Sequence, residues 1–169
     1  MQRLGIYPGT FDPIHDGHLS FALESIKACG LDRVIFLPEN QPRYKVNITP
    51  VESRLLQIKA TALPYAMLDA QLLESSQFTV EATLPEIQDH FKNVKLTLLV
   101  GSDVALSLHK WDGIDALLEA CDIAIGMRSR QTEHEVLAMI DALKRRAPST
   151  AVTVIRTKYP SLASSAFRK

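Results

Sequence analysis

Short apolar runs rich in valine, isoleucine and leucine alternate with longer amphipathic stretches throughout the chain. The runs have the length and composition of strands that are buried on both faces. Alternating strands and helices predict an α/β domain with a mostly parallel sheet, right-handed crossovers and helices on both faces. The predicted strands are Leu4–Tyr7, Arg33–Leu37, Ala66–Asp69, Lys95–Val100, Asp122–Met127 and Ala151–Ile155.

Two of the intervening stretches carry clear helix signals. In the first, Thr49 is expected at the N-cap, Pro50 at the first helical position and Glu52 at the third. An apolar stripe of Leu55, Leu56, Ile58 and Ala62 follows at helical spacing. The second helix is expected over Glu133–Arg146, with basic residues in its last turn. No repeat or interdomain linker interrupts the pattern, so we expect one domain over residues 1–169.

Charge and cysteine content exclude several classes of protein. Nineteen basic residues balance nineteen acidic ones, whereas a domain that binds a nucleic-acid polymer normally has a basic excess. Cys29 and Cys121 lack metal-ligand spacing and are predicted to be buried, reduced thiols. No apolar run approaches the ~20 residues of a membrane helix, and the first strand leaves no room for a signal peptide. We expect a cytoplasmic protein that binds a small molecule; the sequence leaves its oligomeric state open, a homo-oligomer included.

The most specific motif follows the first predicted strand, at the edge of the sheet where α/β proteins bind ligands. Gly9 lets a ligand approach the backbone closely, and a helix that begins near Gly17 offers N–H groups to a phosphate. His15 and His18 are three residues apart and face the same side of a helical turn. Two imidazoles there can donate hydrogen bonds to developing negative charge. No nearby cysteine or glutamate completes a zinc site with them, so no protein-bound metal is expected.

The segment Gly9-Thr10-Phe11-Asp12-Pro13-Ile14-His15-Asp16-Gly17-His18 resembles the signature of the nucleotidyltransferases with the H-x-G-H motif. The resemblance implies a single Rossmann-like (HUP-type) domain that binds ATP and a small phosphate acceptor. It implies that His15 and His18 stabilise the transition state, while Gly9, Thr10, Phe11 and Gly17 belong to the nucleotide site. The acceptor's phosphate then attacks the α-phosphorus directly, and Mg²⁺ enters on the triphosphate rather than bound tightly by the protein.

Later segments resemble the nicotinate-mononucleotide adenylyltransferase branch of this family. Pro42-Arg43-Tyr44-Lys45 is similar to a Pro-Pro-His-Lys loop, from which Arg43 and Tyr44 depart. The match implies that Lys45 reaches the triphosphate; the alternative is a solvated loop lysine. Gly101-Ser102-Asp103 resembles a Gly-Ala-Asp motif, which implies that Gly101 and Asp103 contact a nucleotide ribose. Asp103 also fits a plain helix cap.

Three residues are implied to frame the pyridine ring of the acceptor. Phe78-Thr79-Val80-Glu81-Ala82-Thr83-Leu84 is similar to a Tyr-Thr-x-Asp-Thr-Leu segment, with one extra residue. Thr79 fits an N-cap equally well. Trp111 matches a tryptophan near the pyridine, although the only tryptophan of the chain also suits the core. Asp112 is unexpected, because an acid beside the ring would disfavour the carboxylate of nicotinate.

The end of the chain carries the last motif. Leu162-Ala163-Ser164-Ser165-Ala166-Phe167-Arg168 resembles an Ile-Ser-Ser-Thr-x-Ile-Arg motif. By this match Ser164 and Ser165 cap a short helix that faces the outer phosphates, and Arg168 supplies a fork of donors. The family normally continues with another helix, so a sequence ending at Lys169 indicates either truncation or a compact variant. Arg128 is a weaker nucleotide-site candidate, and His90, His109 and His134 are expected to be ordinary surface residues.

These resemblances favour an enzyme that adenylylates nicotinate mononucleotide on the route to NAD. Two other acceptors remain open, nicotinamide mononucleotide and phosphopantetheine. The stretch Tyr7-Pro8-Gly9-Thr10-Phe11-Asp12-Pro13 taken alone looks more like the phosphopantetheine branch, which usually carries threonine where this chain has His15. A nucleotide-binding domain of the same fold that no longer turns over is the alternative outside enzymes.

Overall fold

The computed structural model describes residues 1–127 and 133–156. Its strands form one six-stranded sheet in the order β3-β2-β1-β4-β5-β6. Every neighbouring pair is parallel, so the predicted sheet is confirmed and is parallel throughout the described strands. Each strand overlaps a predicted apolar run: β1 (Gln2–Gly9), β2 (Arg33–Pro38), β3 (Leu68–Ala70), β4 (Val94–Gly101), β5 (Cys121–Met127) and β6 (Val152–Arg156).

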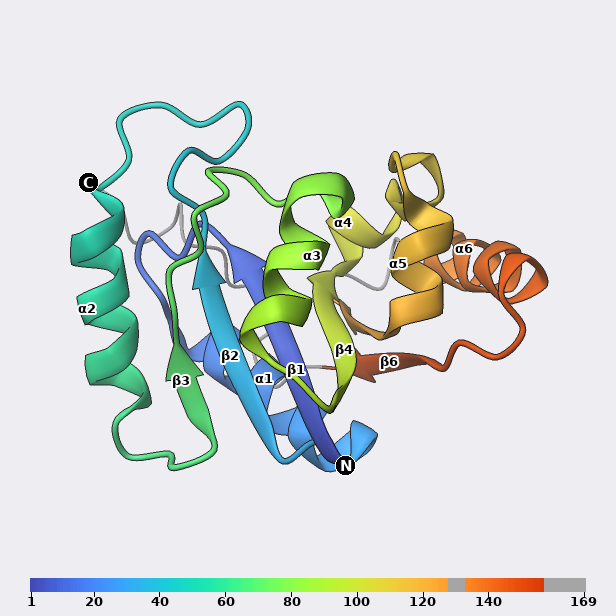
Figure 1. Cartoon of the computed structure of the whole chain (residues 1–169), viewed down its shortest axis with the longest axis horizontal. Helices are drawn as coiled ribbons and strands as arrows, with labels where there is room; N and C mark the ends of the chain where they lie inside the picture. The colour runs from blue at the N-terminus through green and yellow to red at the C-terminus, as the bar shows by residue number, and fades with distance from the viewer. Residues whose placement is uncertain (128–132, 157–169) are drawn as a thin grey trace.

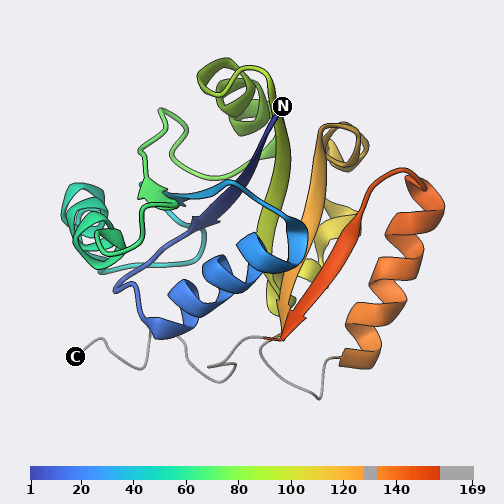
Figure 2. The same cartoon turned by 90° about the horizontal axis from the view of Figure 1, so that it is seen from below.

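Helices cover both faces of the sheet, as the alternation predicts. Figures 1 and 2 show α1 on one face, with α3 and α5 on the opposite face and α2 beside β3. No helix of the described residues is long and apolar enough to cross a membrane. The helical segments are α1 (Asp16–Cys29), α2 (Val51–Ala62), α3 (Val80–His90), α4 (Ser102–Ala105), the 3₁₀ turn η1 (Leu108–Lys110), α5 (Ile114–Ala120) and α6 (Glu133–Arg146).

The sheet separates two apolar layers, because successive side chains of a strand point to opposite faces. Along β4, Leu98 and Val100 belong to the layer that contains the buried residues of α3, α5 and α6. Leu99 between them belongs to the layer that contains those of α1 and α2. All three are buried, which explains why the end of β4, from Leu98 to Val100, is apolar on both faces.

The start of α2 differs from its prediction by one position. Pro50 has φ −50° and ψ 142°, so it is the N-cap and the helix begins at Val51. Thr49 lies outside the helix: the first helical bond runs from the N–H of Arg54 to the carbonyl of Pro50, whereas the carbonyl of Thr49 accepts from Arg54 Nε at 2.7 Å. The N–H of Thr49 donates to Asp12 Oδ2 at 2.9 Å. The buried face of α2 also differs from the predicted apolar stripe. Leu56 is 68% exposed, whereas Arg54, one turn after Val51, is completely buried.

The cysteine and histidine predictions are confirmed in part. Cys121 is buried and free, and burial raises the pKa of its thiol to about 12. Cys29 is half-buried rather than buried, and desolvation raises its pKa as well. His90 and His134 are exposed. His109 is not an ordinary surface residue, because it is half-buried and its Nδ1 is enclosed without a hydrogen-bond partner among the described residues.

Candidate functional site

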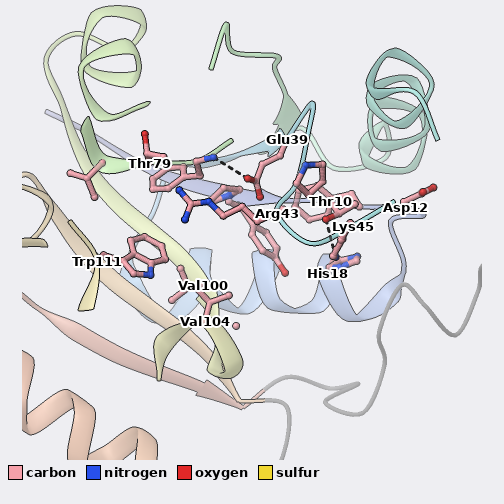
Figure 3. A pocket seen from close by; sticks show the side chains of 18 of the residues that line it. Thr10, Asp12, His18, Glu39, Arg43, Lys45, Thr79, Val100, Val104 and Trp111 are labelled. Carbon is pink, nitrogen blue, oxygen red and sulfur yellow. Dashed lines mark hydrogen bonds between the residues drawn. The ribbon is translucent and has the colours of Figure 1, made fainter. Parts of the chain in front are cut away.

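A cavity of about 900 Å³ opens at the carboxyl ends of β1 and β4. The strand order reverses between these two strands, which is where open α/β sheets bind ligands. In Figure 3, Lys45, Thr10 and His18 lie on one side of this cavity, and Thr79 and Trp111 lie on the other. Four chain segments supply its walls, namely residues 7–12 with His18, 39–45, 78–81, and 100–112.

Gly9 allows the turn after β1 to fold back on itself. A Cβ at Gly9 would lie 2.9 Å from the ring of Phe11, closer than side-chain carbons approach one another. Phe11 has φ 51° and is only 2% exposed, and its ring meets those of Tyr7 and His18 edge to face. The glycine therefore leaves room for Phe11, which in turn supports the histidine pair. Gly9, Thr10 and Phe11 all line the cavity.

His15 and His18 build the start of α1 with their own side chains. His15 is the N-cap, and its Nδ1 accepts a hydrogen bond from the backbone N–H of Gly17 at 3.0 Å. The Nδ1 of His18 accepts from the backbone N–H of His15 at 3.1 Å. This is a capping box made from two imidazoles. Because each Nδ1 accepts a backbone proton, the proton of each neutral ring lies on Nε2.

The two rings stack on each other and are almost enclosed. Their centroids are 3.7 Å apart with an interplanar angle of 20°, and each residue is 8% exposed. His18 contributes to the cavity wall formed by the described residues, and His15 supports it from the stacked position. The cap and the stack leave neither ring free to rotate. The pair therefore presents a fixed Nε2–H donor at the N-terminus of α1, where the helix dipole attracts anions.

Lys45 belongs to a loop that is anchored at several points. Its Nζ donates to Thr10 Oγ1 at 2.9 Å, which brings the predicted lysine to the predicted phosphate turn. Glu39, at the start of the loop, accepts from the backbone N–H of Phe78 at 2.9 Å. The backbone N–H of Gln41 donates to the carbonyl of Ser76 at 2.9 Å. The loop thus joins the turn after β1 to the start of α3.

Arg54 of α2 links the turn after β1 to the loop that follows β2, and it is not part of any motif described above. Its guanidinium donates to the carbonyls of Thr49 at 2.7 Å, Thr10 at 2.8 Å and Asn40 at 3.3 Å. Burial lowers the pKa of Arg54 from its ordinary value, and the carboxylates of Asp12 and Glu39 oppose that shift. The signal in the sequence is weak, since Arg54 differs from an exposed helical arginine only by following Val51 at the spacing of the buried face.

Phe78 and Trp111 form the opposite end of the cavity. Their ring centroids are 6.0 Å apart at an angle of 47°, and both are half-buried against the core. Thr79 is confirmed as the N-cap of α3, because its Oγ1 accepts from the backbone N–H of Ala82 at 3.2 Å. Thr79 also lines the cavity, as does the unexpected Asp112.

Of the remaining predicted site residues, only Gly101 lines the cavity within the described residues. Gly101 lines the cavity and is the N-cap of α4. Asp103 is exposed in the first turn of that helix, so the alternative that it caps the helix is wrong. Gly17 lies in the first turn of α1 and supplies the N–H that His15 caps. Arg128, Ser164, Ser165 and Arg168 lie outside the described residues.

Three comparisons place the chain among known proteins. The family model described as cytidylyltransferase-like matches residues 6–168. A probable nicotinate-nucleotide adenylyltransferase of Neisseria meningitidis serogroup A is 30% identical over 175 residues, covering 100% of this chain and 88% of that protein. One from Clostridium perfringens (strain 13) is 32% identical over 143 residues, covering 81% and 70%.

Solved structures show the same fold. The Plasmodium falciparum nicotinic acid mononucleotide adenylyltransferase complexed with NaAD superposes with a TM-score of 0.73 at 17% identity, covering 98% of this chain and 82% of that one. The same enzyme complexed with APC gives a TM-score of 0.74 at 16% identity, with the same coverage. The arrangement of sheet and helices around the cavity is therefore shared with these enzymes.

Proposed function

Because this chain belongs to the cytidylyltransferase-like family of nucleotidyltransferases, we propose that it transfers AMP from ATP to nicotinate mononucleotide, giving deamido-NAD and pyrophosphate. The observation that carries the proposal is one cavity with two different ends. His18, Thr10 and Lys45 offer donors to a triphosphate at one end, and Phe78 and Trp111 offer aromatic surfaces to a pyridine at the other. The names of the relatives at about 30% identity support this acceptor.

The reaction needs no covalent enzyme intermediate. An oxygen of the acceptor's phosphate forms a bond to the α-phosphorus of ATP as the bond from that phosphorus to the bridging oxygen breaks. The electron pair of the broken bond leaves with pyrophosphate. We propose that His18 Nε2–H donates to the oxygens on which this charge develops and that His15 supports it. Lys45 then acts as a positive charge near the outer phosphates.

Mg²⁺ fits this scheme as part of the substrate. Within residues 1–127 and 133–156, no group of three His, Cys, Asp or Glu side chains is placed to hold a metal ion. We therefore propose that the ion arrives on the triphosphate. Ser164, Ser165 and Arg168 are proposed to hold the outer phosphates, and Gly101 and Asp103 to contact a ribose, on the strength of their motifs alone.

Pyrophosphate release from Mg-ATP tests the proposal. We expect turnover to be strongest with nicotinate mononucleotide when nicotinamide mononucleotide and phosphopantetheine are assayed in parallel. The position of Asp112 in the cavity wall favours the uncharged nicotinamide as the second candidate. Preference for another acceptor would preserve the reaction and change its substrate, whereas ATP binding without turnover on any acceptor would indicate a domain that only binds nucleotides.

Replacing Trp111 with alanine is expected to raise KM for the pyridine mononucleotide about fivefold. Loss of an aromatic contact is worth on the order of 1 kcal/mol, and each ~1.4 kcal/mol changes affinity tenfold. KM for ATP should change little, since Trp111 lies at the end of the cavity away from Lys45. Steady-state kinetics with each substrate varied in turn measures both values. Trp111→Phe is the matched control and should retain most of the affinity.

A further inference from the structure

Arg43 is the one arginine that lines the cavity within the described residues, and the proposed chemistry has not used it. Its Nε donates to Gln77 Oε1 at 3.0 Å, which positions the planar guanidinium next to the Phe78 segment. This bond occupies one edge of the guanidinium. The two terminal nitrogens remain, and no ion pair joins Arg43 to an acidic side chain among the described residues.

The Arg43 side chain also points toward the aromatic end of the cavity. In Figure 3 the guanidinium of Arg43 extends toward the side of the cavity where Thr79 and Trp111 lie, away from Lys45 and His18. Arg43 and Lys45 belong to the same short loop. Lys45 lies at the end of the cavity near His18, and Arg43 extends toward the end near Trp111. The loop is fixed where Glu39 and Gln41 bind the segment before α3. Arg43 is therefore held at the aromatic end.

We propose that Arg43 binds the carboxylate of the nicotinate ring and thereby selects nicotinate mononucleotide over nicotinamide mononucleotide. The inference rests on the proposed function and adds a specificity-determining residue to it. A ring placed against Phe78 and Trp111 presents its substituent to this part of the wall. A guanidinium matches a carboxylate with two parallel hydrogen bonds, which an uncharged carboxamide cannot accept equally well.

The carboxylates of the cavity wall favour a cation beside the ring substituent. Glu39, Glu81 and Asp112 all line it, so an anionic ring substituent meets a wall rich in carboxylates. Without Arg43 this wall would favour the neutral amide over the acid. The charge of Arg43 offsets the repulsion for the acid and gives little to the amide. Selectivity arises from this difference between two affinities.

Lys110 is the competing cation at this end, because it also lines the cavity and directly precedes Trp111. Both side chains are exposed, but Arg43 is held by its bond to Gln77, whereas no side-chain hydrogen bond within the described residues positions the Nζ of Lys110. A mobile ammonium gives charge without direction. Substituting Arg43 and Lys110 in turn therefore shows which of the two side chains binds the carboxylate.

The experiment measures kcat/KM for both mononucleotides at saturating Mg-ATP. Arg43→Met is expected to lower the preference for nicotinate mononucleotide by roughly 10–100-fold, the range for a lost charge-assisted hydrogen-bonded contact. KM for ATP should stay within about twofold. Arg43→Lys should recover part of the preference, because it restores the charge without the fork. Lys110→Met and the surface variant Arg145→Met should keep the wild-type ratio.

A binding measurement complements the kinetics. Trp111 is the only tryptophan of the chain, so its fluorescence reports a pyridine bound at this end. In titrations without turnover, we expect Arg43→Met to weaken nicotinate mononucleotide by roughly 10–100-fold and to leave nicotinamide mononucleotide within about threefold. An unchanged ratio in Arg43→Met, or a loss that follows Lys110→Met instead, would overturn the assignment.

The wild-type protein separates failure of this inference from failure of the proposed function. A wild type that adenylylates both mononucleotides without preference, or prefers the amide, contradicts the role of Arg43 and preserves adenylyl transfer to a pyridine mononucleotide. A wild type that neither binds nor adenylylates either mononucleotide contradicts the proposed function, and the role of Arg43 with it.

Discussion

His18→Asn is expected to lower kcat/KM for adenylyl transfer by on the order of 10²–10³, the usual cost of removing one donor to developing charge in a transition state. The asparagine amide oxygen can take the place of Nδ1, which accepts the backbone N–H of His15, while nothing replaces Nε2–H. The start of α1 should therefore survive the substitution. Most of the loss should appear in kcat, because the contact strengthens only as charge develops.

His18→Ala is the partner variant that separates chemistry from folding. It removes both the donor and the cap, so we expect the same kinetic loss together with a loss of about 0.5–2 kcal/mol in the free energy of unfolding. Urea unfolding of the two variants compares their stability, and pyrophosphate release compares their turnover. If His18→Asn turned over at the wild-type rate, the proposed role of His18 would be refuted.

Arg54→Met should be the most destabilising single substitution considered, with a loss of about 3–5 kcal/mol in the free energy of unfolding. Methionine fills the space of the side chain but donates nothing to the carbonyls of Thr10, Asn40 and Thr49. Each carbonyl left buried without a partner costs about 1–3 kcal/mol, and partial relaxation toward water reduces the sum. Asp12 and Glu39 would also lose the positive charge that faces them.

Arg33→Met is the matched control for that measurement. Arg33 pairs with Asp69 at 3.4 Å, and their side chains are 41% and 50% exposed. An exposed ion pair of this kind contributes at most ~1 kcal/mol. Urea denaturation midpoints should therefore fall steeply for Arg54→Met and hardly at all for Arg33→Met. Similar stabilities of the two variants would show that Arg54 does not hold the loops together.

The sheet could be predicted from the sequence because buried parallel strands leave a direct signature in hydropathy. Every residue from Leu96 to Gly101 is buried, and all but Thr97 are apolar or glycine, so this part of β4 has the composition of a buried strand. The position of the cavity followed from the same reasoning, since the carboxyl ends of the strands and the motif after β1 pointed to one edge. These predictions need only the local composition of the strands and the general rule that ligands bind at the carboxyl ends of parallel strands.

The contacts beneath the cavity could not be predicted in this way. Leu56 was assigned to the buried face of α2 and Arg54 was not, because hydropathy treats an arginine as a surface residue. Arg54 is buried only because carbonyls from two distant loops satisfy its donors. Thr49, just before the helix, likewise donates its N–H to a residue far away in the sequence, Asp12. Such partners are fixed by tertiary structure and leave no local pattern.

The position of β1 in the middle of the sheet has a consequence for synthesis of the chain. β1 is made first, but on one side it pairs with β4, so that Gln2 meets Val94 only after more than half of the chain has been translated. Until then one edge of the central strand stays open, and open edges invite pairing with other chains. The cavity lies where β1 and β4 meet. A nascent chain therefore acquires this cavity only when the two halves of the sheet have joined, and binding of the proposed nucleotide is expected to report that this step is complete.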